Sequence, residues 1–360
     1  MDLNHTRIAV LCYYQLLPER VGGMDYFFWM FDQKCKEKGI AVDWFFPNES
    51  IHGGYTSLHI ITKEHQDIEP CFLEYCKNNN PCYEYVITHF IELCIPFYKS
   101  IKTVCDAKII AVDHNPRPLG GYSLLKKIEK RVKGFLYSKY VYLFVGVSNY
   151  TVNEIIKDYG KLIRGKVITV YNGVLLHDII SRNTKSTKKP KFLVASHLRK
   201  SKGIQDLIEA VFLLPKAIQN EVHIDIYGDG PYKEYLLNKT IACNVDECFT
   251  FMGSKPNLKE IFCNYDYMLQ PTHMECFSLS ILESLAANVP VITTSVGGNE
   301  EVINDAENGF IYKAKDVVAL SNLIKELILG NKQITITTRL LIETTFSIET
   351  MVDNHIKLLL

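Results

Sequence analysis

The sequence predicts an α/β protein made of two Rossmann-like domains, each built on a parallel sheet. Its length of 360 residues corresponds to two domains at roughly 150 residues each. Hydrophobic residues make up 47% of the chain and charged residues 22%, a composition typical of globular proteins. Short β-branched and aromatic runs alternate with longer helical patterns, as is typical of parallel sheets covered by helices.

The expected strands are short apolar runs that recur in both halves of the chain. Most are almost continuously apolar, as expected when helices cover both faces of a sheet. In the first half they are Arg7–Cys12, Ala41–Phe46, Tyr85–Thr88, Lys108–Val112, Leu143–Val147 and Val167–Tyr171. In the second half they are Phe192–Ala195, His223–Tyr227, Phe249–Met252, Tyr267–Gln270, Val291–Thr294 and Phe310–Tyr312.

A polar segment separates the two series of strands. It reads SRNTKSTKKPK, from Ser181 to Lys191, and contains no apolar residue that could join a core. This composition predicts a linker, so we expect an N-terminal domain over 1–180 and a C-terminal domain over 190–345. Sheets of this kind bind ligands at the carboxyl ends of their strands. The residues that follow each strand are therefore the candidates for a functional site.

Charge, cysteine spacing and hydropathy exclude several classes of protein. Forty basic and 40 acidic residues give a formal net charge of +0, so no nucleic-acid partner is expected. None of the 11 cysteines forms a CxxC pair, which favours reduced thiols over a zinc site or a disulfide framework. No apolar run approaches the roughly 18 residues that span a bilayer, and the start lacks a signal-peptide pattern. These features predict a cytoplasmic protein.

The most informative segment follows the fourth strand of the second series. A helix is expected to begin around Ser278, and Glu283 lies in it among the apolar neighbours Leu279, Ala286 and Ala287. A buried carboxylate costs several kcal/mol unless a partner satisfies it. Helix side chains lean toward the N-terminus, where the unpaired amides form a natural site for a phosphate. A sugar nucleotide would use both features; the alternative is that Glu283 lies on a solvated edge and pairs with a lysine.

Together, several motifs resemble the retaining glycosyltransferases of family 4, which have the two-domain GT-B fold with an interdomain cleft. The paired glutamates of that family, E-x7-E, correspond to Glu275 and Glu283. Its Gly-Gly-x-x-Glu corresponds to Gly297–Glu301, and its Asn-Gly-Val to Asn172–Val174. E-x7-E alone is a weak signal, but all three motifs occur in the right order at the ends of predicted strands.

The resemblance implies roles for residues around the paired glutamates. Glu283 would bind the nucleotide ribose, and Glu275 would lie near the donor sugar as a binding and catalytic candidate. The backbone amides of Phe277, Ser278 and Leu279 would face the sugar and the diphosphate.

The family's G-R-L-x-x-x-K-G pattern corresponds here to the segment from Ser196 to Gly203. Lys202 matches the phosphate-binding lysine; the alternative is an ordinary solvated lysine. His197 stands where the arginine is expected, so His197 or Arg199 would supply the second cation, and the pattern leaves that choice open.

Other matches are less specific. Gly228, in YGDGP, and Gly253 end strands where the nucleotide is expected, although each could simply be a tight turn. Gly22 and Gly23 resemble the loop over the donor phosphate. His114 matches a histidine that contacts the donor sugar or the nucleophile, against the alternative of a structural histidine, and His89 is a second candidate.

The implied function is a retaining transfer of a sugar from a nucleoside diphosphate, expected to be a UDP-sugar, to a hydroxyl of a glycan or lipid-linked acceptor. No two aspartates stand two apart, so the D-x-D metal motif is absent and we expect neither a metal nor another cofactor. The resemblance suggests bacterial surface-polysaccharide assembly, and a helix over 346–360 that packs back on the first domain. Rival interpretations are a sugar-nucleotide epimerase or hydrolase, a non-catalytic sugar-nucleotide binding module and an exported two-lobed binding protein.

The segment from Tyr122 to Tyr140 is expected to be a basic amphipathic helix. Leu125, Ile128, Val132 and Phe135 recur at helical spacing among several lysines. Such a helix can lie on an anionic membrane, which would place the protein at the inner face of the cell membrane. The alternative is an ordinary packed helix with a solvated basic face.

Overall fold

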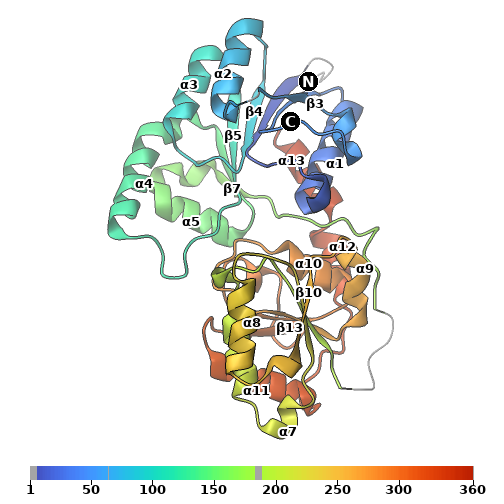
Figure 1. The fold of residues 1–360 in the computed structure, drawn as a ribbon. Coiled ribbons are helices and arrows are strands. Elements are labelled where there is room, and N and C mark those ends of the chain that lie inside the picture. The colour runs from blue at the N-terminus through green and yellow to red at the C-terminus, as the bar shows by residue number, and fades with distance from the viewer. Residues whose placement is uncertain (1–5, 64, 183–188, 360) are drawn as a thin grey trace. The chain divides into compact units, whose positions relative to one another are not determined.

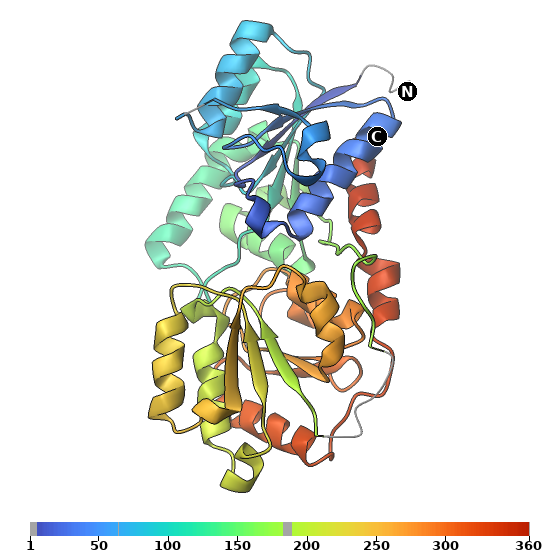
Figure 2. The same ribbon diagram turned by 45° about the vertical axis from the view of Figure 1, so that its right-hand side comes forward.

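The computed structural model describes residues 6–63, 65–182 and 189–359, and it divides the chain into two compact units. Unit 1 comprises residues 1–116, 120–172 and 348–360, and unit 2 comprises residues 117–119 and 173–347. The predicted α/β class with two Rossmann-like parallel sheets is confirmed (Figures 1 and 2).

Unit 1 contains a seven-stranded parallel sheet in the order β3-β2-β1-β4-β5-β6-β7. Helices α2 to α5 cover one face, and α1 and α13 cover the other (Figure 1). The strands are β1 (Arg7–Cys12), β2 (Ala41–Phe45), β3 (His59–Ile61), β4 (Tyr85–His89), β5 (Lys108–Asp113), β6 (Leu143–Gly146) and β7 (Val167–Thr169). The helices are α1 (Gly23–Glu37), α2 (Ile68–Asn79), α3 (Pro96–Val104), α4 (Leu124–Tyr137), α5 (Asn149–Tyr159) and α13 (Ile348–Lys357).

Unit 2 repeats this plan with six parallel strands in the order β10-β9-β8-β11-β12-β13. The strands are β8 (Phe192–Ala195), β9 (Ile224–Tyr227), β10 (Phe249–Gly253), β11 (Tyr267–Gln270), β12 (Val291–Thr294) and β13 (Gly309–Tyr312). The helices are α6 (Ile204–Phe212), α7 (Lys216–Gln219), α8 (Lys233–Ala242), α9 (Leu258–Ile261), α10 (Leu279–Ala286), α11 (Val317–Ile328) and α12 (Arg339–Thr345). Apolar side chains of the strands and of α6, α8 and α11 form a core cluster in this unit.

Both sheets have a topological switch point, where the chain reverses the direction in which it adds strands. It lies between β1 and β4 in unit 1 and between β8 and β11 in unit 2. The loops that leave two neighbouring strands diverge at such a point, which opens a crevice at the carboxyl edge of the sheet. Functional side chains are therefore expected after β8 and β11.

The chain passes between the units four times, after Pro116, Leu119, Asn172 and Ser347, whereas the sequence suggested the polar segment from Ser181 to Lys191; residues 183–188 of that segment lie outside the described residues. Next to the passage at Asn172, the amide of Val174 donates to the carbonyl of Phe346 at 3.0 Å. The segments that follow Asn172 and precede Ser347 are thus paired within unit 2.

The last helix, α13, belongs to unit 1 and packs against α1. Lys34 of α1 forms an ion pair with Asp353, and the ring of His355 lies 4.8 Å from that of Phe27, centroid to centroid. None of the helices in the described ranges is both long and apolar enough to cross a membrane.

Candidate active site

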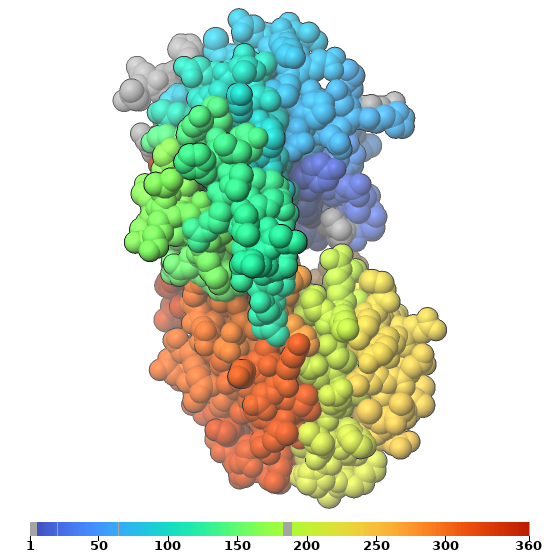
Figure 3. Space-filling model, turned by 90° about the vertical axis from the view of Figure 1, so that its left-hand side faces the viewer, coloured from blue at the N-terminus to red at the C-terminus, as the bar shows by residue number. Residues whose placement is uncertain are grey.

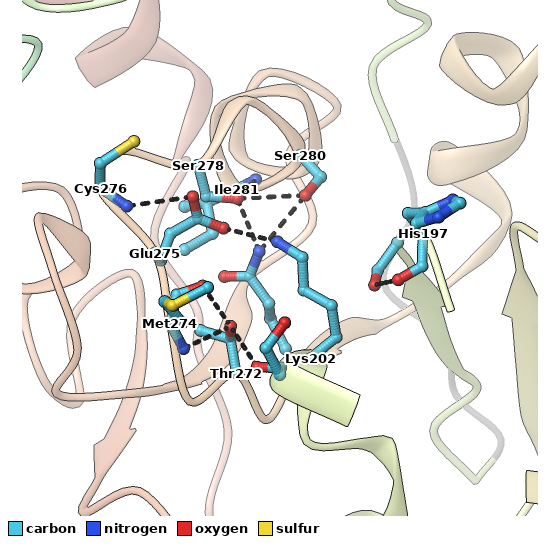
Figure 4. Close-up of polar contacts among 12 residues, drawn as sticks. His197, Lys202, Thr272, Met274, Glu275, Cys276, Ser278, Ser280 and Ile281 are labelled. Carbon is cyan, nitrogen blue, oxygen red and sulfur yellow. Dashed lines mark hydrogen bonds and ion pairs between the residues drawn. The ribbon is translucent and has the colours of Figure 1, made fainter. Parts of the chain in front are cut away.

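The switch point of unit 2 brings together Lys202 and Glu275. Lys202 ends a short 3₁₀ turn after β8, and Glu275 lies in the loop between β11 and α10. The Lys202 Nζ is 2.9 Å from the Glu275 Oε2, and the side chains are 25% and 12% exposed. Figure 4 shows the two side chains reaching toward each other from different loops. The sequence predicted both residues as site residues but not their ion pair.

The two loops are joined along their backbones as well. The amide of His273 donates to the carbonyl of Ser201 at 2.8 Å, and the His273 Nε2 lies 2.5 Å from the Asp206 Oδ2. Gly203 has φ +70°, and a Cβ there would lie 1.7 Å from the carbonyl oxygen of Pro271. Glycine at 203 is therefore required both by backbone conformation and by the close approach of the second loop.

The Gly-Gly pair after β12 supports Glu275 from the other side. Gly297 has φ +66°, and a Cβ there would lie 2.1 Å from the carbonyl oxygen of Glu275. The amide of Gly298 donates to the carbonyl of Cys276 at 2.9 Å, and Asn299 donates to the Thr293 hydroxyl at 3.0 Å. The part of the motif up to Asn299 thus fixes the backbone that presents Glu275.

Helix α10 begins beside this ion pair. Ser278 is its N-cap, and the Ser278 Oγ accepts a hydrogen bond from the amide of Ile281 at 3.4 Å. Gln270, the last residue of β11, donates to the same Oγ at 2.6 Å. The first turn contains no acidic residue, so its partial positive charge is not offset within the helix. The predicted helix start at Ser278 is confirmed.

Glu283 lies one turn further along α10 and is partly buried. Burial raises the pKa of its carboxyl from 4.5 to about 7, and the charge of Lys259 on α9 opposes that rise. Lys259 is 3.8 Å from Asp178, and burial lowers its pKa. The side chain of Glu283 is therefore not on a solvated edge, and its charge acts on a lysine that the sequence pattern did not indicate.

Two further loops meet at the same edge of the sheet. Gly228 has φ +124°, and a Cβ there would lie 2.0 Å from the carbonyl oxygen of Ser196. Its amide donates to the carbonyl of Gly253 at 3.0 Å, so the two predicted glycines are hydrogen-bonded neighbours. The YGDGP turn therefore packs directly on the loop that carries His197.

His197 and Arg199 are both exposed. In Figure 4 the ring of His197 lies apart from Lys202 and Glu275. The amide of Arg199 donates to the carbonyl of His197 at 2.9 Å, so the two residues flank a tight turn. Which of the two cations accompanies Lys202 stays an open prediction.

The predicted glycine pair of unit 1 lies at the start of α1. Gly22 is the N-cap and Gly23 the first helical residue, and a Cβ on Gly22 would have no atom within 4 Å. The space beside Gly22 is therefore open, unlike that beside Gly203. The carboxylate of Asp25 is hydrogen-bonded to neighbours within unit 1. It accepts from the Gly22 amide at 2.8 Å, from the Tyr14 hydroxyl at 2.8 Å and from the Tyr55 hydroxyl at 2.6 Å.

His114 follows β5 and forms part of a row of three buried histidines. The His114 Nε2 is 3.0 Å from the Nδ1 of His89, and the ring of Phe90 stacks on His114 with centroids 4.3 Å apart. His355 of α13 is next in the row, 6.0 Å from His89 between ring centroids. Burial lowers the pKa of His114 to about 3, so this ring is neutral at ordinary pH. His355 was not a candidate from the sequence, because the resemblance assigned no role to its helix beyond packing.

In the described part of the chain, no group of three or more His, Cys, Asp or Glu residues is arranged to hold a metal ion. All 11 cysteines are free thiols.

The comparisons with known proteins agree with this geometry. Residues 177–337 match the family described as Glycosyl transferases group 1. Among curated proteins, the chain is 28% identical over 168 residues to N-acetyl-alpha-D-glucosaminyl L-malate synthase of Bacillus anthracis, an alignment covering 44% of this chain and 44% of the synthase. It is 29% identical over 147 residues to the GtfA subunit of the UDP-N-acetylglucosamine–peptide N-acetylglucosaminyltransferase of Streptococcus pneumoniae, covering 41% of this chain and 28% of that subunit. The chain thus spans less than half the length of these curated relatives.

Solved structures resemble almost the whole chain. HepE of Anabaena, in complex with UDP, has a TM-score of 0.77 at 14% identity and covers 98% of this chain and 99% of its own. The lipopolysaccharide outer core galactosyltransferase WaaB has a TM-score of 0.72 at 16% identity and covers 97% of this chain and 98% of its own. The chain therefore has the GT-B fold, and its residues 177–337, which carry the Lys202–Glu275 pair and Glu283, match the family model of the glycosyl transferases group 1.

Proposed function

We propose that the protein is a retaining glycosyltransferase that transfers a sugar from a UDP-sugar to a hydroxyl of a glycan or lipid-linked acceptor. The observation that carries the proposal is the switch point of unit 2. There Lys202 meets Glu275 at 2.9 Å beside the start of α10, and Glu283 lies partly buried in the same helix. The UDP in the HepE complex supports the choice of nucleotide.

In this proposal the diphosphate lies on the first turn of α10 and next to Lys202. An ammonium group has three N–H donors, and the Lys202 Nζ donates one of them to the Glu275 carboxylate. The others are available to phosphate oxygens, where they stabilise the charge that develops as the diphosphate departs. Glu283 accepts from the ribose hydroxyls, which offsets the cost of its burial. The backbone at Phe277 and Leu279 contributes amides at the same place, and Gly228 and Gly253 leave room for the nucleotide.

The reaction breaks the bond between the anomeric carbon of the donor and the β-phosphate oxygen, and forms a bond from that carbon to the acceptor oxygen on the same face of the sugar. The proton of the acceptor hydroxyl passes to the departing phosphate oxygen, so no protein nucleophile is needed. Glu275 then binds and polarises the sugar. His114, which is neutral because burial lowers its pKa to about 3, acts as a hydrogen-bonding partner of the sugar or the nucleophile and not as a cation.

We further propose that the transfer needs no metal ion, because Lys202 and the amides of α10 supply the positive charge that a divalent ion supplies elsewhere. Treatment with EDTA is expected to leave turnover unchanged, and loss of turnover that Mg²⁺ restores would contradict this metal independence.

We also propose that the reaction takes place in the cytoplasm, at the inner face of the cell membrane, during assembly of a bacterial surface polysaccharide.

The test is release of UDP from a panel of UDP-sugars by the full chain, with and without a panel of glycan and lipid-linked acceptors. We expect slow release without acceptor and faster release with the right one. Lys202→Ala should lower turnover by about a hundredfold or more, whereas Lys313→Ala, an exposed lysine of unit 2, should not. Conversion of the sugar with no acceptor-dependent product would favour an epimerase or hydrolase, and binding of UDP-sugars without any turnover would favour a binding module.

A further inference from the structure

Helix α4 is packed with the opposite orientation to the one its sequence suggests. Its buried residues are Lys130 and Gly134. The Lys130 Nζ is 3.4 Å from the Asp158 Oδ2 and 3.2 Å from the hydroxyl of Tyr159. A Cβ on Gly134 would lie 2.1 Å from the carbonyl oxygen of Tyr159. This satisfied lysine and this close backbone contact fix α4 against α5.

The apolar stripe of α4 therefore faces outward. At about 100° per residue, Leu125, Ile128, Val132 and Phe135 fall within an arc of about 80°, opposite Lys130 and Gly134. They are 81%, 53%, 51% and 72% exposed. A contiguous exposed apolar stripe is uncommon on a soluble protein and marks a binding surface. The helix packs on α5 and its cations Lys127 and Arg131 are exposed, as the alternative of an ordinary packed helix predicts, but the apolar stripe is not the packed face.

Cations gather next to this stripe. A hollow of about 660 Å³ lies between α4, α5 and the residues that follow α5, and its lining includes Arg131, Lys157, Lys161 and Arg164 but no carboxylate. The neighbouring Leu162 is 82% exposed. Figure 3 looks onto this side of unit 1 and shows α4 and α5, in teal to green, at the surface. The apolar stripe of α4 and the cationic hollow are together called the α4 surface below.

We propose that the α4 surface docks the protein on a bilayer that contains anionic lipids. The stripe enters the interfacial layer, and the cationic hollow receives lipid phosphates. Apolar side chains flanked by cations are the combination that interfacial helices use, and each cation near an anionic surface strengthens binding. A second copy of the chain fits less well, because a two-fold contact places the same patch against itself and would bring the two cationic hollows together.

This inference deepens the proposed function, on which it rests only for the identity of the acceptor. Helix α4 follows directly in sequence from the loop after β5, where His114 lies. Docking through α4 would hold the carboxyl edge of the unit 1 sheet near the bilayer, where a lipid-linked acceptor is found. Binding to lipid itself requires no turnover, so the two proposals can fail separately.

The test is flotation of the full chain with vesicles, at low ionic strength, in a sucrose gradient. We expect the protein to float with vesicles of equal parts phosphatidylcholine and phosphatidylglycerol, much less with phosphatidylcholine alone, and less at high salt. The double variant Leu125→Ser/Phe135→Ser should lower the vesicle partition coefficient by about tenfold or more. Arg131→Glu/Arg164→Glu should do the same through charge.

The controls are matched in type and located in unit 2. Leu340→Ser changes an apolar side chain that is 63% exposed, and Lys313→Glu reverses an exposed cation; both should float like the original protein. All variants should bind UDP alike, which separates docking from the donor site. The proposal is overturned if the original protein does not float with anionic vesicles, if the controls lose flotation equally, or if the α4 variants only dissociate a dimer, which would assign the surface to a second copy.

Discussion

Partial burial of Glu283 is the residue-scale observation on which the donor site rests. Removal from water raises the pKa of its carboxyl to about 7, so near neutral pH the group is partly protonated. A ligand whose hydroxyls donate to the carboxylate binds the ionised form better. Nucleotide binding should therefore release a proton from Glu283 and lower its pKa.

The affinity of UDP-sugars should accordingly rise as pH increases from about 5 to about 8. The diphosphate of a UDP-sugar does not change its charge in this range, so it does not mask the effect of Glu283. Isothermal titration at several pH values measures the effect. Glu283→Gln should weaken binding by about 1–3 kcal/mol at high pH and remove most of the pH dependence; an unchanged pH slope in this variant would show that another group titrates.

Two glycines with left-handed backbone provide a matched test of the site's architecture. Gly203 and Gly330 have φ of +70° and +73°, but only at 203 would a Cβ collide with backbone, 1.7 Å from the carbonyl oxygen of Pro271. Gly330→Ala should therefore cost about 1 kcal/mol of unfolding free energy. Gly203→Ala should cost about 3 kcal/mol or more and weaken UDP binding, because the Lys202 and Glu275 loops must separate.

Urea unfolding of the two glycine variants measures the difference. Equal costs at both positions would mean that the loops accommodate the Cβ, and that the junction between them is less constrained than the structure indicates.

The sequence predicted the site residues that belong to a linear motif and missed the partners that the fold supplies. Glu275, Ser278 and Glu283 could be identified because spacing along one segment fixes them. Lys259, whose charge acts on Glu283, comes from α9, and no local pattern relates it to α10. The role of His197 was also not predictable, because it depends on the direction in which a short exposed turn places the side chain.

At the scale of elements, α4 shows why a helical pattern does not determine which face is buried. The periodicity of its apolar residues was predicted correctly, but burial was decided by tertiary contacts of Lys130 and Gly134 with α5. A sequence pattern cannot reveal that a lysine is satisfied by Asp158 and Tyr159. Strand β3 was missed for a simpler reason, since its apolar run is only Ile60–Ile61, whereas the equally short edge strand β7 lies in the longer β-branched and aromatic run Val167–Tyr171.

Helix α13 makes the stability of unit 1 sensitive to acid. Its His355 donates from Nδ1 to the carbonyl of Met351 at 2.9 Å, and burial lowers the pKa of His355 to about 4. Burial also lowers the pKa of His89 and His114. In the unfolded chain these histidines take up protons near pH 6.5, so the unfolded state binds more protons as pH falls from 6.5 toward 4.

Stability of unit 1 should therefore fall with pH in that window, by up to about 1.4 kcal/mol per pH unit for each histidine. His355→Asn keeps a donor near the position of Nδ1 and removes one titrating group. Its melting temperature should thus fall less steeply between pH 6.5 and 5 than that of the original protein. Parallel slopes in differential scanning calorimetry would mean that His355 is protonated in the folded state.

At the scale of the whole molecule, the alternation of strands and helices predicted a parallel sheet in each unit, and the six strands of unit 2 follow the same order as the first six of unit 1. The places where the chain passes between the units were not predictable in that way. The polar segment from Ser181 has the composition of a linker, yet the chain passes between the units after Pro116, Leu119, Asn172 and Ser347. Near the last two passages, a backbone hydrogen bond joins Val174 to Phe346. Composition predicts which residues stay outside a hydrophobic core, but it does not predict where the chain passes from one core to the other.

The most direct test of the donor site is isothermal titration of the full chain with UDP. We predict binding that Lys202→Ala and Glu283→Ala each weaken by about tenfold or more, while Lys313→Ala, the exposed control, leaves it unchanged. Absence of UDP binding by the folded protein, or binding that neither Lys202→Ala nor Glu283→Ala alters, would contradict the assignment of the switch point of unit 2 as a nucleotide-sugar site.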